Sequence, residues 1–92
     1  MLKPKFTGQF KKDYKQALKR GCDSNKLWEV ITMLVEEKPL PVSKRDHALT
    51  DSRTYKNMRE CHIEPDWLLI YKIESEVMLL KLVRTGSHSD LF

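Results

Sequence analysis

Apolar side chains in the first 38 residues of the chain recur at the spacing of α-helices. In residues 8–20 they follow an i, i+4, i+7, i+8 stripe, and the remaining face is rich in lysine. A wider apolar face runs through residues 24–38 and ends before Pro39. Gly21 is a stop signal for the first segment. Because so few residues separate the two segments, the pattern predicts a helical hairpin.

The rest of the chain shows a different pattern, in which apolar runs are short and bounded by polar turns. Residues 67–73 and 77–83 are dense in apolar side chains and predict the two strands of a hairpin. Further strands are predicted at residues 3–7 and 55–63, and residues 39–54 predict a long loop with a functional or interaction role. Both faces of the hairpin are apolar, which is typical of central strands. The order predicts an α+β fold, with an N-terminal strand and a two-helix hairpin packed on a mainly antiparallel sheet.

The predicted hairpin also indicates which polar side chains meet at its open end. A loop of residues 74–76 would place Asp66 opposite Arg84, and a two-residue turn would keep them adjacent. His62 and His88 would emerge at the same end. Since histidine gains and loses protons near neutral pH, we expect a compact acid–base site there.

Composition limits the kind of protein that this chain can be. With 92 residues, we expect one small domain over residues 1–92. The sequence has no apolar run of 18 residues, and its N-terminus lacks the apolar stretch of a signal peptide, so we expect a cytoplasmic protein that does not span a membrane. Three glycines and no glycine-rich loop exclude a nucleotide-cradling loop, and no cofactor is expected. Cys22 and Cys61 lack metal or redox spacing and predict free thiols.

The charge distribution favours an anionic partner. The net charge is +4 and the isoelectric point is about 9.1, which is typical of proteins that bind nucleic acid. The positive charge is concentrated in residues 3–20, where Asp13 is the one acidic residue. We expect Lys11, Lys12 and Lys15 to contact RNA phosphates, although such lysines are also typical of a solvated helix face.

Three spaced segments of the chain, together with its start, closely resemble the YafQ toxins, which belong to the RelE/ParE superfamily of bacterial type II toxin–antitoxin systems. The matching segments are residues 7–13, 46–49, 62–72 and 84–92. The resemblance covers essentially the whole chain, with Ala48 in a position that favours proline and a weaker match over residues 49–57. The positions that match the family's functional residues are His47, His62, Asp66, Trp67, Arg84, His88 and Phe92.

The resemblance implies a RelE-like fold and a ribosome-dependent endoribonuclease that cuts mRNA in the decoding site. It also implies a cognate antitoxin as partner, besides the 70S ribosome and mRNA.

The residues suit RNA cleavage by the 2′-hydroxyl group, which needs a base, an acid and positive charge on the phosphate. We expect His88 to be the general acid and Asp66 the base, with His47 or His62 as the alternative base. Arg84 would hold the phosphate through two hydrogen bonds.

The remaining expectations concern the stacking of RNA bases and the need for a metal ion. Trp67 and Phe92 offer flat surfaces for an unstacked base. The histidines and Asp66 are too scattered along the sequence to predict a metal site, so we expect catalysis without metal.

Two other functions fit parts of the sequence. A ParE-like gyrase inhibitor would share the fold without cleaving RNA, but it needs no set of acid–base groups. A small basic module that binds RNA or protein predicts that His88→Ala leaves the biological effect intact, whereas the nuclease predicts loss of toxicity with retained folding.

Overall fold

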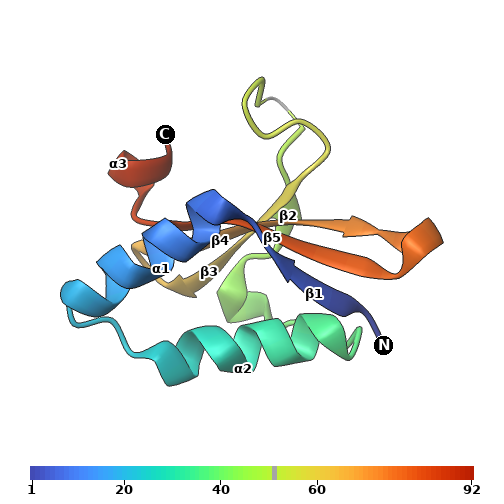
Figure 1. The fold of residues 1–92 in the computed structure, drawn as a ribbon, viewed down its shortest axis with the longest axis horizontal. Coiled ribbons are helices and arrows are strands. Elements are labelled where there is room, and N and C mark those ends of the chain that lie inside the picture. The colour runs from blue at the N-terminus through green and yellow to red at the C-terminus, as the bar shows by residue number, and fades with distance from the viewer. Residues whose placement is uncertain (51) are drawn as a thin grey trace.

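The computed structural model describes residues 1–50 and 52–92 and has an α+β architecture (Figure 1). The strands are β1 (Lys3–Phe6), β2 (His47–Ala48), β3 (Arg59–Glu64), β4 (Trp67–Glu74) and β5 (Leu79–Gly86). The helices are α1 (Gly8–Lys19), α2 (Ser24–Val35) and α3 (His88–Leu91), with single 3-10 turns at Val42–Lys44 and Ser75–Val77. The strand order is β1-β5-β4-β3-β2, and β1 is parallel to β5 while the other pairs are antiparallel. The predicted fold class is confirmed.

The two-helix hairpin forms where the sequence predicts it because both helices have local start and stop signals. The Thr7 hydroxyl accepts a hydrogen bond from the backbone of the first turn of α1, and Asp23 does the same for α2. Gly21 takes a left-handed conformation, with φ of +85°, just after α1. The predicted end of α2 at residue 38 is wrong by three residues, because Glu37 adopts a left-handed φ of 58° and turns the chain after Val35.

Apolar side chains cover both faces of the sheet, as predicted for central strands. The larger core lies between the sheet and the helices α1 and α2, and includes Phe10, Leu27, Ile31, Leu69 and Leu82. A smaller core lies on the opposite face, where the long loop and α3 cover the sheet. Its buried members are Tyr55, Leu68, Ile70 and Leu91.

The predicted register of the β4–β5 hairpin is wrong. Ile70, and not Asp66, lies opposite Arg84. The connection between the strands contains the turn Ser75–Val77 followed by Met78 in a left-handed conformation, so it is longer than the predicted loop. A β-bulge beyond Ile70 shifts the pairing further.

Two short elements and the bounds of two strands differ from the prediction. The strand predicted at residues 77–83 spans Leu79–Gly86, because residues 75–78 form the connection. The strand predicted at residues 55–63 begins only at Arg59, since Asn57 adopts a left-handed conformation with φ of 63°. Inside the predicted loop, β2 pairs with β3. The chain ends in α3, which the sequence did not predict. No helix in the described ranges has the length and apolar character to cross a membrane.

Candidate active site

Residues from four strands form a row across the face of the sheet opposite α1 and α2. His47 lies opposite Glu60, which lies opposite Ile70, which lies opposite Arg84. Side chains at directly opposite positions project to the same face, so these residues share the face of the smaller core. His62 lies in the next row, opposite Leu68. The register therefore places His47, His62 and Arg84 on one face of the sheet, and the Arg84 guanidinium extends from there to Asp13 of α1.

Glu60 links the first two histidines. Its side chain is buried, and Oε1 lies 3.7 Å from Nε2 of His47 and 3.4 Å from Nε2 of His62. Nδ1 of His47 donates to the Arg45 carbonyl at 2.6 Å, and Nδ1 of His62 donates to the Pro65 carbonyl at 3.3 Å, since a carbonyl can only accept. A second proton on either ring would then sit at Nε2, facing the carboxylate. Glu60 was not among the residues predicted from the sequence, although its i, i+2 spacing from His62 places both side chains on one face of a strand.

The third histidine faces the second across the open end of the sheet. The ring centroids of His88 and His62 are 6.2 Å apart. The Phe92 ring lies 5.6 Å from His88 and 5.4 Å from Tyr55, and it is 57% exposed. The predicted proximity of His62 and His88 is confirmed, and Phe92 keeps a surface on which a base could stack.

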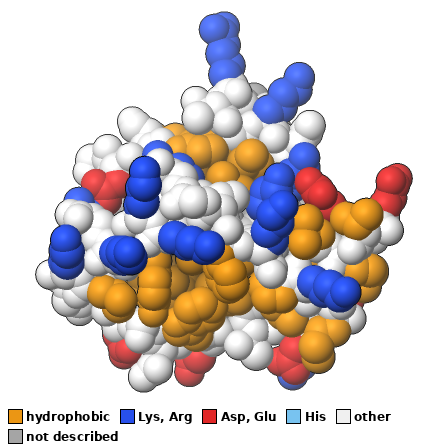
Figure 2. All heavy atoms as spheres, viewed as in Figure 1, with side chains coloured by type: hydrophobic (Ala, Val, Ile, Leu, Met, Phe, Trp, Pro, Cys, Tyr) orange, Lys and Arg blue, Asp and Glu red, His pale blue; other side chains and the backbone are white. Residues whose placement is uncertain are grey.

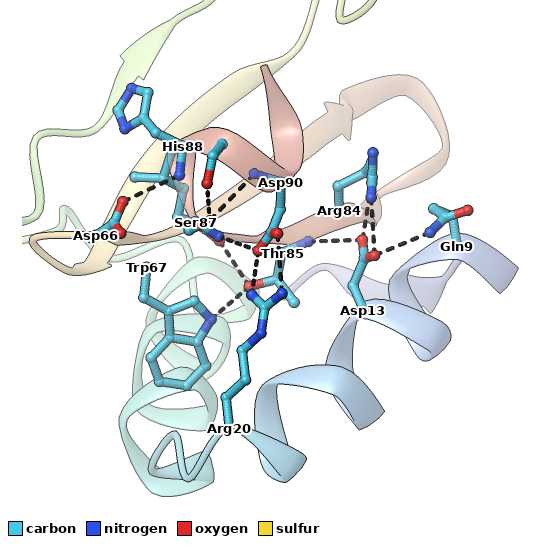
Figure 3. Close-up of polar contacts among 12 residues, drawn as sticks. Gln9, Asp13, Arg20, Asp66, Trp67, Arg84, Thr85, Ser87, His88 and Asp90 are labelled. Carbon is cyan, nitrogen blue, oxygen red and sulfur yellow. Dashed lines mark hydrogen bonds and ion pairs between the residues drawn. The ribbon is translucent and has the colours of Figure 1, made fainter.

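Asp66 lies near His88 but not near Arg84. It occupies the turn between β3 and β4, where Oδ1 accepts a hydrogen bond from the backbone N–H of His88 at 3.2 Å (Figure 3). Asp66 therefore holds the start of α3. It also remains exposed, within reach of substrate.

Arg84 pairs instead with Asp13 of α1, which sequence analysis did not connect to it (Figure 3). Nε and Nη2 donate to the two carboxylate oxygens at 3.0 Å each. The backbone N–H of Thr85 also donates to Asp13, at 3.2 Å. The hydrogen bonds that Arg84 donates to the Asp13 carboxylate raise the pKa of Arg84. Asp13 fixes the guanidinium through two of its five N–H groups.

The structure removes Trp67 from the predicted stacking surface. The side chain is packed in the larger core and is 5% exposed. Its indole N–H donates to the Thr85 hydroxyl at 2.9 Å, and that hydroxyl donates to the Leu68 carbonyl at 2.7 Å. Trp67 therefore connects β4 to β5, and its ring faces are covered by protein.

The predicted RNA-contacting lysines are exposed but lie away from the histidines. Lys11, Lys12 and Lys15 belong to α1, which packs on the other face of the sheet. Figure 2 shows basic side chains in a row along α1, beside apolar surface between α1 and α2. The exposed side chains of Leu18 and Trp28 belong to these helices. Across residues 1–50 and 52–92, no group of three or more His, Cys, Asp or Glu side chains is arranged to hold a metal ion.

Comparison with known proteins gives consistent matches over the whole chain. The model of the family described as "Bacterial toxin of type II toxin-antitoxin system, YafQ" matches residues 2–92. The mRNA interferase toxin YafQ of Escherichia coli BL21-DE3 is 47% identical over 88 residues, which is 95% of this chain and 91% of that protein. The putative toxin YafQ of Haemophilus influenzae is 36% identical and covers 97% of this chain and 90% of its own length.

Solved structures agree with this assignment. The crystal structure of YafQ from E. coli BL21(DE3) has a TM-score of 0.89 at 43% identity, covering 100% of this chain and 99% of that one. YafQ in the E. coli DinJ–YafQ complex has a TM-score of 0.88 at 44% identity, with the same coverage. A metal-bound toxin from Helicobacter pylori has a TM-score of 0.92 at 42% identity, with full coverage of both chains. This chain belongs to the YafQ family of bacterial toxins of type II toxin–antitoxin systems.

Proposed function

We propose that this toxin is an mRNA interferase, an endoribonuclease that cleaves mRNA in the decoding site of the ribosome. The observation that carries the proposal is the gathering of His47, His62 and His88 on one face of the sheet, with Arg84 in the same row. Three segments that are distant in sequence supply these groups, at residues 47, 62 and 84–88. An inhibitor that acts by binding alone has no need of such a set.

Attack by the RNA's own 2′-hydroxyl group requires a base, an acid and positive charge near the phosphate. His88 is the proposed acid, because it stands on the exposed α3 across 6.2 Å from His62. Two imidazoles in this arrangement can address opposite sides of one phosphate. Arg84, fixed by Asp13, supplies positive charge.

The base belongs to the set of Asp66, His47 and His62. Asp66 is exposed and uses one oxygen to hold α3, so its other oxygen is available to the 2′-hydroxyl. His62 is the alternative that the geometry supports, since its ring lies 6.2 Å from that of His88 and is held by Glu60 and the Pro65 carbonyl.

Substrate contacts come from both faces of the molecule. Phe92 provides an exposed ring beside His88 on which an unstacked base can lie. Lys11, Lys12 and Lys15 extend from α1 and are placed to bind ribosomal RNA phosphates, while the opposite face cuts the message.

The second proposed partner is a cognate antitoxin. The related E. coli toxin is described in a complex with DinJ. The basic charge of this chain favours an antitoxin with an acidic or amphipathic segment that folds when it binds.

Cleavage of an mRNA on programmed bacterial ribosomes tests the function. The wild-type protein is expected to make position-specific cuts in the decoding site, and His88→Ala is expected to lose at least about a hundredfold in rate, since acid–base groups contribute on the order of 10²–10⁴-fold. Ser75→Ala, at the exposed far end of the hairpin, is the control for handling and folding. Growth arrest in cells without any cut on ribosomes would contradict the proposal and point to gyrase.

A further inference from the structure

The helix that carries the proposed acid has little stability of its own. α3 contains four residues. Isolated helices of this length do not persist in water, so other groups must hold α3. Yet His88 must keep a defined position relative to His62 if both act on one phosphate. The contacts that hold α3 therefore bear on catalysis.

A side chain from α1 reaches α3 across 70 positions of sequence. The guanidinium of Arg20, at the C-terminal end of α1, binds the carboxylate of Asp90 with both of its terminal nitrogens, Nη1 to Oδ2 and Nη2 to Oδ1 at 3.1 Å (Figure 3). Such a two-point contact fixes orientation as well as distance. The hydrogen bonds from Arg20, and then that from the Ser87 backbone, hold the pKa of Asp90 well below its usual range.

Asp90 also forms hydrogen bonds with Ser87 at the start of α3, so it links Arg20 to the backbone of this helix. Its carboxylate accepts the Ser87 N–H at 2.9 Å, and the Ser87 hydroxyl accepts the Asp90 N–H at 3.2 Å, so the two residues form a capping box. His88 lies inside this box and is the next residue after Ser87. The position of Arg20 therefore sets where the first turn of α3 begins.

Arg20 holds α3 from the side of the helices. It lines a cleft between α1 and α3, together with Asp66, Arg84 and Ser87. The other restraints on α3 come from the sheet side, through Asp66 and through Tyr55, whose hydroxyl donates to the Leu91 carbonyl at 2.8 Å. Arg20 alone among these ties α3 to the helical layer.

We propose that Arg20 is a positioning residue for RNA cleavage, which acts through Asp90 and α3 to hold the His88 imidazole in place. The inference rests on the proposed function. Arg20 does not touch the proposed reacting groups, and exposed ion pairs add little to global stability. Replacing Arg20 should therefore slow the cleavage step and reduce the local order of α3. It should hardly change the midpoint of unfolding. Small displacements of a catalytic group can lower rates on the order of a hundredfold.

The experiment compares Arg20→Ala and Arg20→Lys with Lys19→Ala. Lys19→Ala removes one positive charge from the same end of α1 and leaves Asp90 its partner, so it controls for weaker binding to ribosomes. Each protein is assayed for the rate constant of mRNA cleavage at saturating ribosomes, for the half-saturating ribosome concentration, and for hydrogen exchange of the Leu91 and Phe92 amides.

Arg20→Ala is expected to lower the cleavage rate constant about tenfold or more and to speed exchange of both amides, with a half-saturating concentration like that of Lys19→Ala. Arg20→Lys, which keeps the charge but not the two-point contact, is expected to recover part of the rate. Faster exchange in Arg20→Ala with a wild-type cleavage rate would overturn the positioning role, and so would wild-type values of both. If the wild-type protein cleaves nothing, the proposed function fails, while exchange still decides whether Arg20 anchors α3.

Discussion

Gly86 allows α3 to pack close to the end of β5, and replacing it with alanine is the sharpest test of that arrangement. A Cβ atom at Gly86 would lie 3.0 Å from both Cβ and Oδ2 of Asp90. Cβ of Asp90 is close to the backbone and cannot swing away, and Oδ2 is engaged by Arg20. Relief therefore requires α3 itself to move by a few tenths of an ångström.

The size of the effect follows from two opposing contributions. Overpacking of this kind lowers the free energy of unfolding by about 1–3 kcal/mol. The smaller conformational entropy of alanine in the unfolded chain raises it by about 0.4–1 kcal/mol. We expect Gly86→Ala to lose about 0.5–2 kcal/mol in the free energy of unfolding. For a domain of this size, each kcal/mol lowers the melting temperature by about 4–8 °C.

Urea denaturation and ribosome cleavage measure the two consequences. Gly8→Ala is the matched control, because a Cβ there meets no other described atom within 4 Å and alanine favours a helix. We expect Gly8→Ala to be neutral or stabilising with full cleavage, and Gly86→Ala to be less stable and slower to cleave because His88 moves with α3. Equal stability and equal cleavage in the two variants would refute the close packing of α3 on β5.

Four further predictions concern buried groups. Burial raises the pKa of Cys61 to about 12, so a thiol reagent at pH 8 should modify the half-buried Cys22 and spare Cys61 in the folded protein; equal labelling would contradict this. The same shift stabilises the fold below the ordinary thiol pKa of 9.0, and in pH titrations of urea unfolding this contribution should disappear as the pH rises towards 12. Tyr55→Phe should cost about 1–3 kcal/mol in the free energy of unfolding, because it leaves the Leu91 carbonyl without its donor, and an unchanged urea midpoint would oppose this. Leu69→Ala, at a position with 0% exposure between the sheet and the helices, should cost about 2–5 kcal/mol by the same measurement, and a loss below 1 kcal/mol would show that the core is not packed as described.

Elements whose hydrogen bonds are local could be predicted from the sequence. The helices α1 and α2 appear where apolar spacing and the cap at Thr7 place them, because each helical hydrogen bond joins residues only four positions apart. The strands β4 and β5 were also predicted, since their apolar runs are long. The segments that resemble YafQ toxins identified the family, and the family match over residues 2–92 confirms it.

The partners of the candidate site residues were decided by tertiary structure. The register of β4 and β5 depends on the turn conformation at Met78 and on one β-bulge, and an error of a few residues separates Asp66 from Arg84. Arg84 instead meets Asp13, which is 71 positions away in sequence, and no local pattern connects them.

The sequence by itself determined which side chains of this toxin are available for chemistry, and the tertiary structure decided how each is used. Trp67 belongs to the motif, but packing buries its ring in the core. Glu60 went unnoticed in the sequence, but strand pairing places its carboxylate between two histidines. α3 is too short to form alone, and it exists because Arg20 and the sheet hold it. Contacts across long sequence separations form only when the whole chain has folded, which is why they leave no periodic or local signal in the sequence.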